Sequence, residues 1–186
     1  MRGEDRLIAV NTHLDLVEKH LRGLCILDGG ASVDEPAPAQ LAWREHVRRV
    51  GAIVERAHTY LGAARQTVSD VADDLRSALG SVEHDLRLLG QVCAMVDELG
   101  GEAARYLAAA TGQVVAEGGS HERMLMLAAD SRNLQAARSN AQAAARVAHD
   151  MVGDSAVVPS PTRRTGRQQE HRQPWQFALD PTGPPR

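Results

Sequence analysis

Aromatic side chains are scarce in this sequence: they make up 3% of its 186 residues and include a single phenylalanine. Hydrophobic residues nevertheless reach 43%, so alanine, leucine and valine must supply the core. Such small and aliphatic residues suit helices that approach each other closely, and they argue against a β-sandwich. The length suffices for one domain of ordinary size, or for one domain and a tail.

Proline is absent from residues 39–158, where average usage would place about six. The gap favours nearly continuous helix, because proline breaks helix interiors. Glycines divide the stretch instead: we expect a break and reversal at Gly100-Gly101 and a stop at Gly118-Gly119. At Gly80-Ser81 a turn is possible, but the uninterrupted register of the apolar residues favours a kink.

Apolar residues recur at alternating intervals of three and four along most of the chain, which is the pattern of a heptad seam. The longest seam consists of Val47, Val50, Val54, Ala57, Leu61, Ala64, Val68, Val71, Leu75, Ala78, Val82, Leu89, Val92, Val96 and Leu99. An apolar stripe of this kind must lie against other helices. We therefore predict an all-α, antiparallel helical bundle over residues 1–152. Its coiled-coil-like helices are expected at about 5–27, 38–99, 101–117 and 120–152.

The segment 153–186 lacks this periodicity and is rich in proline and arginine, which predicts a disordered tail. Four residues within it stand out: Pro174, Trp175, Phe177 and Leu179. Scarce aromatic residues are unexpected in a segment that cannot bury them. Three interpretations stay open: a short motif that docks on a protein partner, a segment that folds back onto its own bundle, or a chance placement.

The charge distribution and the N-terminal residues disfavour several classes of protein. Net charge is −3; five arginines and three acids follow residue 153, so the tail carries +2 and the body −5. An acidic body disfavours nucleic-acid binding. The chain contains no apolar run near the roughly 20 residues of a membrane span and begins without an apolar leader, so we expect a cytoplasmic protein without membrane insertion. The near-absence of lysine is typical of a G+C-rich bacterial genome.

Catalytic motifs are missing as well: we find no nucleophile elbow, phosphate-binding loop or dinucleotide fingerprint. Glu55 and His58 have the spacing of a di-iron helix, but no second copy exists and the seam turns them to the flank. His13 and His20 share one helix face, where partial exposure is the simplest interpretation. We therefore predict no catalytic residue, no metal site, no cofactor and no enzymatic activity. Cys25 is expected to be a reduced, buried thiol, as is Cys93.

Trp43 lies beside three arginines, Arg44, Arg48 and Arg49, at the start of the long predicted helix. A basic cluster with an aromatic residue could stack on a nucleobase or contact an acidic partner. A tryptophan at this position more often closes the end of a bundle, and we favour that interpretation.

Two functional hypotheses follow. The first is a non-enzymatic interaction or scaffold protein, which binds a protein partner through its bundle surface and the tail motif, and which can form a homodimer. The alternative is a sensor bundle that binds a small ligand or a metal. In that case Asp85 and Asp130, which interrupt the seams at core positions, would face inward and help line a pocket. A reversal at Gly100-Gly101 would let the two residues approach each other, or each would pair with an arginine.

Overall fold

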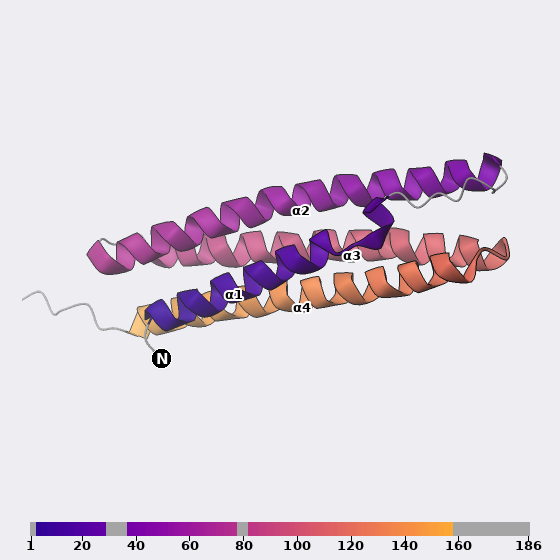
Figure 1. Cartoon of the computed structure of the whole chain (residues 1–186). Coiled ribbons are helices and arrows are strands. Elements are labelled where there is room, and N and C mark those ends of the chain that lie inside the picture. Colours follow the sequence, from indigo (N-terminus) through magenta and orange to yellow (C-terminus); the bar gives the residue numbers. More distant parts are fainter. Residues whose placement is uncertain (1–2, 29–36, 78–81, 158–186) are drawn as a thin grey trace, which may run out of the picture.

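The computed structural model describes residues 3–28, 37–77 and 82–157. Within these ranges the chain forms four long helices and one short 3₁₀ helix, with no strand. They are α1 (Gly3–Arg22), η1 (Cys25–Asp28), α2 (Ala37–Ser77), α3 (Val82–Ala116) and α4 (His121–Val157). The long helices lie side by side along one direction (Figure 1). The prediction of an all-α bundle is confirmed.

Cross-helix hydrogen bonds fix the direction of α1 relative to α4. Nδ1 of His13 lies 2.9 Å from Oδ1 of Asn140, and one heptad later Nδ1 of His20 lies 3.3 Å from Oδ1 of Asn133. A step of seven forward on α1 is thus a step of seven backward on α4. The two helices are antiparallel.

Helices α2 and α3 are also antiparallel. Nε2 of His46 lies 3.2 Å from Oε1 of Gln113, while the guanidinium of Arg56 donates to Glu102 at 2.8 Å. The chain therefore reverses between α2 and α3, and the kink favoured by the sequence pattern is wrong. The pattern was misleading because both helices turn their seams to one core, so the register survives the reversal. Residues 78–81 themselves lie outside the described residues.

The expected break at Gly100-Gly101 is also wrong, because α3 continues through both glycines. The glycines instead allow the side chain of Arg138 on α4 to pass close to α3. A Cβ atom on Gly100 would lie only 2.6 Å from Cγ of Arg138 on α4, whose side chain crosses this point. Nε of Arg138 then donates to Asp97 at 2.8 Å. The next predicted stop is confirmed: Gly118 has a φ of 65°, and Gly119 donates to the carbonyl of Val114 at 2.8 Å.

The first helix ends earlier than predicted and the last one ends later. Helix α1 ends at Arg22 rather than near residue 27, and η1 follows it. The cause is the buried carboxylate of Asp130, which accepts the N–H groups of Cys25 at 2.6 Å and Ile26 at 2.8 Å and so draws the chain out of the helix. Helix α4 extends to Val157, so residues 153–157 belong to the bundle and not to the tail.

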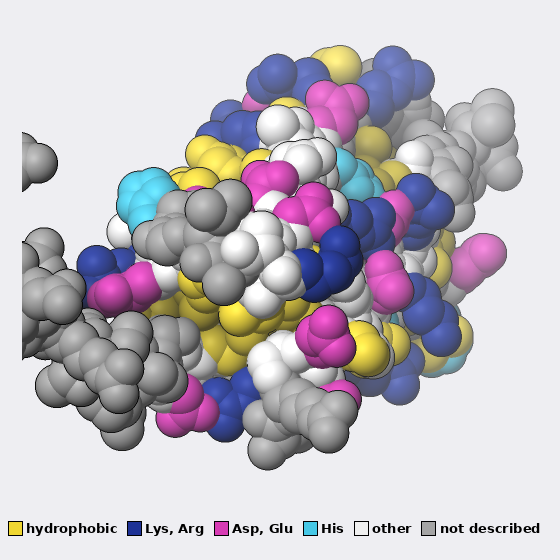
Figure 2. All heavy atoms as spheres, turned by 90° about the vertical axis from the view of Figure 1, so that its left-hand side faces the viewer, with side chains coloured by type: hydrophobic (Ala, Val, Ile, Leu, Met, Phe, Trp, Pro, Cys, Tyr) yellow, Lys and Arg dark blue, Asp and Glu magenta, His cyan; other side chains and the backbone are white. Residues whose placement is uncertain are grey.

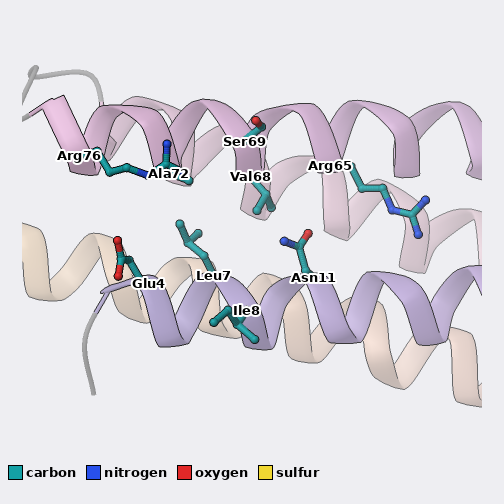
Figure 3. Close-up of a pocket in the computed structure, with 9 residues that line it drawn as sticks. All are labelled: Glu4, Leu7, Ile8, Asn11, Arg65, Val68, Ser69, Ala72 and Arg76. Carbon is teal, nitrogen blue, oxygen red and sulfur yellow. The ribbon is translucent and has the colours of Figure 1, made fainter.

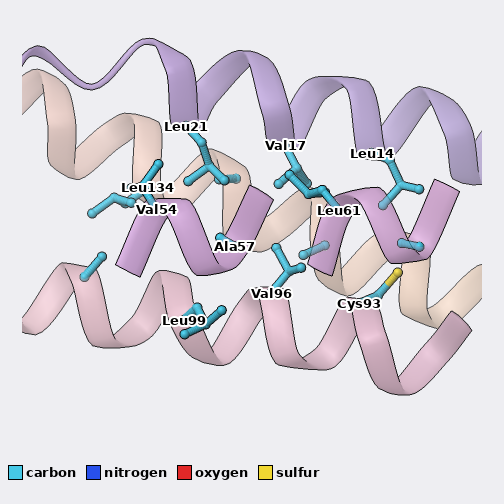
Figure 4. Close-up of a cluster of buried hydrophobic side chains, with 14 of the residues drawn as sticks. Leu14, Val17, Leu21, Val54, Ala57, Leu61, Cys93, Val96, Leu99 and Leu134 are labelled. Carbon is cyan, nitrogen blue, oxygen red and sulfur yellow. The ribbon is translucent and has the colours of Figure 1, made fainter. Parts of the chain in front are cut away.

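The core is one continuous apolar cluster that runs along the axis of the bundle. Its middle consists of leucines, valines and small residues from all four helices, among them Leu14, Leu61, Val96 and Leu134 (Figure 4). The cluster ends at Trp43, which is 4% exposed, as expected for a residue that closes the bundle. In the ranges given above, none of the helices combines the length and the apolar character that crossing a membrane requires.

Candidate functional site

A groove opens between α1 and α2 near the start of the chain (Figure 3). Its volume is about 430 Å³, within the range of ligand pockets. The apolar part of its lining consists of Leu7 and Ile8 from α1 and Val68 and Ala72 from α2. Ile8 is 65% exposed. The polar part of the lining consists of Glu4, Asn11, Arg65, Ser69 and Arg76. The site is therefore an apolar strip with charged borders.

The groove exists because α1 packs more closely on α4 than on α2. The buried face of α4 presents four fully or nearly fully buried alanines, Ala137, Ala141, Ala144 and Ala148. Small side chains let two helix backbones approach. On the other side, the longer Arg65 of α2 spans the gap and pairs with Asp15 and Glu18 of α1. Its hydrogen bond lowers the pKa of Glu18.

The end of the bundle beside the groove is acidic. We define the acidic end as residues 3–8, 70–77, 82–88 and 149–154, where nine carboxylates accompany three arginines. The carboxylates are those of Glu4, Asp5, Asp70, Asp73, Asp74, Glu83, Asp85, Asp150 and Asp154. Figure 2 views the molecule from this side and shows acidic side chains scattered around an exposed apolar area. Several of the carboxylates form ion pairs, such as Asp154 with Arg6 at 2.5 Å.

The tail residues predicted from the sequence, Pro174, Trp175, Phe177 and Leu179, lie outside the described residues. The structure nevertheless shows where their segment begins. Helix α4 ends at Val157, three residues after the ion pair of Asp154 with the first turn of α1. The segment 158–186 therefore starts at the acidic end, next to the groove.

The pocket expected between Asp85 and Asp130 is not formed. Asp130 is fully buried, as its position in the seam predicts, but its two oxygens accept backbone N–H groups of η1. Asp85 is half-buried in the first turn of α3. Because Arg138 of α4 lies beside Asp97 of α3, Asp130 lies about 30 Å farther along the bundle than Asp85. Their separation removes the basis of a shared ligand site.

The histidines of α1 form structural hydrogen bonds rather than a ligand set. The side-chain N–H of Asn140 donates to the carbonyl of Ala136 at 2.9 Å, and that of Asn133 donates to the carbonyl of Gly23 at 2.8 Å. Each amide oxygen is therefore left to accept from a histidine Nδ1–H. In the residues that the structure describes, no group of three or more His, Cys, Asp or Glu side chains could hold a metal ion.

At the opposite end of the bundle, the Trp43 end, the indole ring is buried and 4% exposed. The guanidinium carbon of Arg123 lies 4.6 Å from the ring centroid of Trp43, and that of Arg49 lies 5.2 Å from the ring centroid of Tyr106. Both contacts are cation–π interactions. Trp43 is thus engaged within the bundle, which leaves no exposed ring to stack on a nucleobase.

Sequence reasoning missed the groove because it assigned every seam residue of α1 and α2 to a common interior. Leu7 and Val68 are indeed buried seam residues. The available signal was Ile8, an apolar residue that follows Leu7 and cannot share its face. Comparisons with family models, with curated proteins and with solved structures find no match to this chain.

Proposed function

We propose that this chain is a non-enzymatic interaction protein of the cytoplasm, which binds a protein partner through its bundle surface and through the tail motif of Pro174, Trp175, Phe177 and Leu179. The observation that carries the proposal is the apolar groove between α1 and α2, with Ile8 65% exposed at its border. Apolar surface of this kind marks interaction sites in helical proteins. Neither cysteine of the described residues forms a disulfide, which agrees with a reducing compartment.

Self-association forms part of the proposal. Leu88 and Met95 lie seven residues apart on α3 and are 41% and 37% exposed. Side chains separated by one heptad share a helix face and suit contact with a second bundle. Sedimentation velocity over a wide concentration range tests this part. A dimer that Leu88→Glu dissociates is expected, and a monomer at every concentration would contradict it.

The partner is tested by affinity capture with the full chain and with the double variant Trp175→Ala/Phe177→Ala. A matched control, Gln168→Ala/Gln169→Ala, alters two nearby tail residues without removing apolar surface. We expect at least one protein to be lost from the aromatic double variant and retained by the control. Its binding is then measured by calorimetry with both purified proteins. Identical sets of captured proteins for all three chains would overturn the role of the motif.

A further inference from the structure

The first observation is the position of the groove relative to the tail. The 16 residues 158–173 separate the end of α4 from the apolar motif, and a chain of that length spans at most about 55 Å. The α1 side of the groove, residues 4–11, extends over about 10 Å from the same end of the bundle. The motif of the same chain can therefore reach every part of the groove.

Charge complementarity gives the second observation. The segment 158–186 contains five arginines and two acidic residues, whereas the acidic end has nine carboxylates and three arginines. Opposite net charges within about 10 Å attract each other at physiological salt. This attraction would favour docking of the basic segment at the end of the bundle at which the groove opens.

The third observation concerns the apolar side chains on both sides. Trp175, Phe177 and Leu179 occur at every second position, so an extended segment projects all three to one side. The groove offers an apolar strip of matching character, formed by α1 and α2. Covering it with the motif would bury the apolar surface of both partners.

We propose that residues Pro174–Leu179 dock in the α1–α2 groove of the same chain and thereby hide the motif from its protein partner. This inference rests on the proposed function, because the hidden motif is the one that the partner binds. The covalent link makes docking intramolecular, so a weak contact suffices to keep the groove filled. A partner must then compete with the groove, and partner binding releases the segment from α1 and α2.

The test measures how well acrylamide quenches the fluorescence of Trp175 in the full-length protein. Its contribution is obtained by subtracting the signal of the Trp175→Phe chain, in which only Trp43 emits. Ile8→Glu places a charge in the groove at a residue that is 65% exposed, so folding is retained. Leu41→Glu is the matched control, since Leu41 is also 65% exposed but lies at the Trp43 end.

We expect Trp175 to be shielded in the native chain and its quenching constant to rise about threefold in Ile8→Glu. Leu41→Glu leaves the shielding unchanged. Ser69→Glu, which charges the α2 wall at an exposed residue, has the same effect as Ile8→Glu. Raising the salt concentration weakens the shielding, because it screens the charges of the tail and the acidic end.

Three results would overturn the proposal: a Trp175 that is fully accessible in the native chain, shielding that neither Ile8→Glu nor Ser69→Glu reduces, or shielding that grows with protein concentration. The last result would assign the groove to the tail of a second copy. Failure of the docking proposal can be distinguished from failure of the proposed function. If Trp175 is accessible but the partner still depends on it, the motif binds a partner without docking. If Trp175 is shielded but no partner depends on it, docking stands and the proposed function falls.

Discussion

The two ends of the bundle are built differently although α2, α3 and α4 run through both. Helix α1 has 20 residues and α2 has 41, so α1 accompanies only part of its neighbour. Four helices form the acidic end, whereas α2, α3 and α4 alone provide the described residues of the Trp43 end (Figure 1). The transition lies at η1, where Asp130 of α4 holds the chain after α1.

The difference shows how a bundle adapts its side chains to the number of helices. At the four-helix end, the buried face of α4 consists largely of alanines, which let neighbouring helix backbones approach closely. At the three-helix end, large side chains such as Trp43, Leu107 and Leu127 fill the core. The charge changes as well: residues 41–49 and 105–123 contain five arginines and three glutamates. One end is thus acidic and lies beside the groove, and the other is basic.

Removal of the tryptophan is expected to have the largest effect, because Trp43 is the largest of the buried side chains that fill the three-helix end. Trp43→Ala should lower the free energy of unfolding by about 4 kcal/mol in urea denaturation. Trp43→Phe should cost far less, since the buried indole N–H has no hydrogen-bond partner among the described residues. Leu41→Ala, at an exposed position two residues away, is the control. Equal losses for the alanine and phenylalanine variants at residue 43 would contradict this account.

The second-largest loss of stability is expected for substitution of Asp130, whose carboxylate lies at the transition between the two ends. Asp130→Ala leaves the N–H groups of Cys25 and Ile26 without their acceptor, which should cost about 3 kcal/mol. In this variant we also expect hydrogen exchange, relative to the parent chain, to accelerate more in η1 and the last turn of α1 than in α3. Asp150→Ala, at an exposed acid on the same helix, is the matched control. Uniform loss of protection throughout the bundle would show that η1 is not held locally.

Overpacking of the α1–α4 contact should have a moderate effect. Ala141→Leu inserts a larger side chain where α4 is fully buried and should cost about 2 kcal/mol. Ala128→Leu makes the same change at an exposed position of α4 and should stay within about 0.5 kcal/mol of the parent. Thermal unfolding followed by circular dichroism gives both values. Equal stability of the two variants would mean that the alanines do not set the helix spacing.

The smallest effect is expected for the exposed ion pairs of the Trp43 end. Hydrogen bonds from Arg48 and Arg49 lower the pKa of Glu45 from 4.5 to about 2. Because the folded-state pKa is lowered, the stabilisation is present above pH 4.5 and is lost as the pH falls towards 2. Because Glu45, Arg48 and Arg49 are exposed to solvent, the stabilisation by these ion pairs is small. Glu45→Gln should therefore leave the midpoint of unfolding nearly unchanged. NMR titration of the carboxyl carbon checks the pKa, and a midpoint near pH 4.5 would contradict the ion pairs.

Much of the fold could be predicted from the heptad seams, since Val10, Leu14 and Leu134 are buried where the periodicity places them. The ends of the helices were less predictable. A glycine pair indicates a break only when nothing crosses it, and Arg138 crosses Gly100 from a helix distant in sequence. Of the candidate site, the sequence predicted the tail motif but not the groove. Its groove depends on how far α1 lies from α2, which no local pattern specifies.

The sequence by itself determined that this chain forms helices with one apolar face each, because side-chain spacing of three and four residues decides which residues can share a face. It also determined the Schellman turn at Gly118, where a positive φ favours glycine. Only the tertiary structure decided that α2 and α3 are antiparallel, that α1 leans on α4, and that a groove remains between α1 and α2. These features depend on contacts between residues far apart in the chain, and the sequence of a single helix does not specify the energies of those contacts.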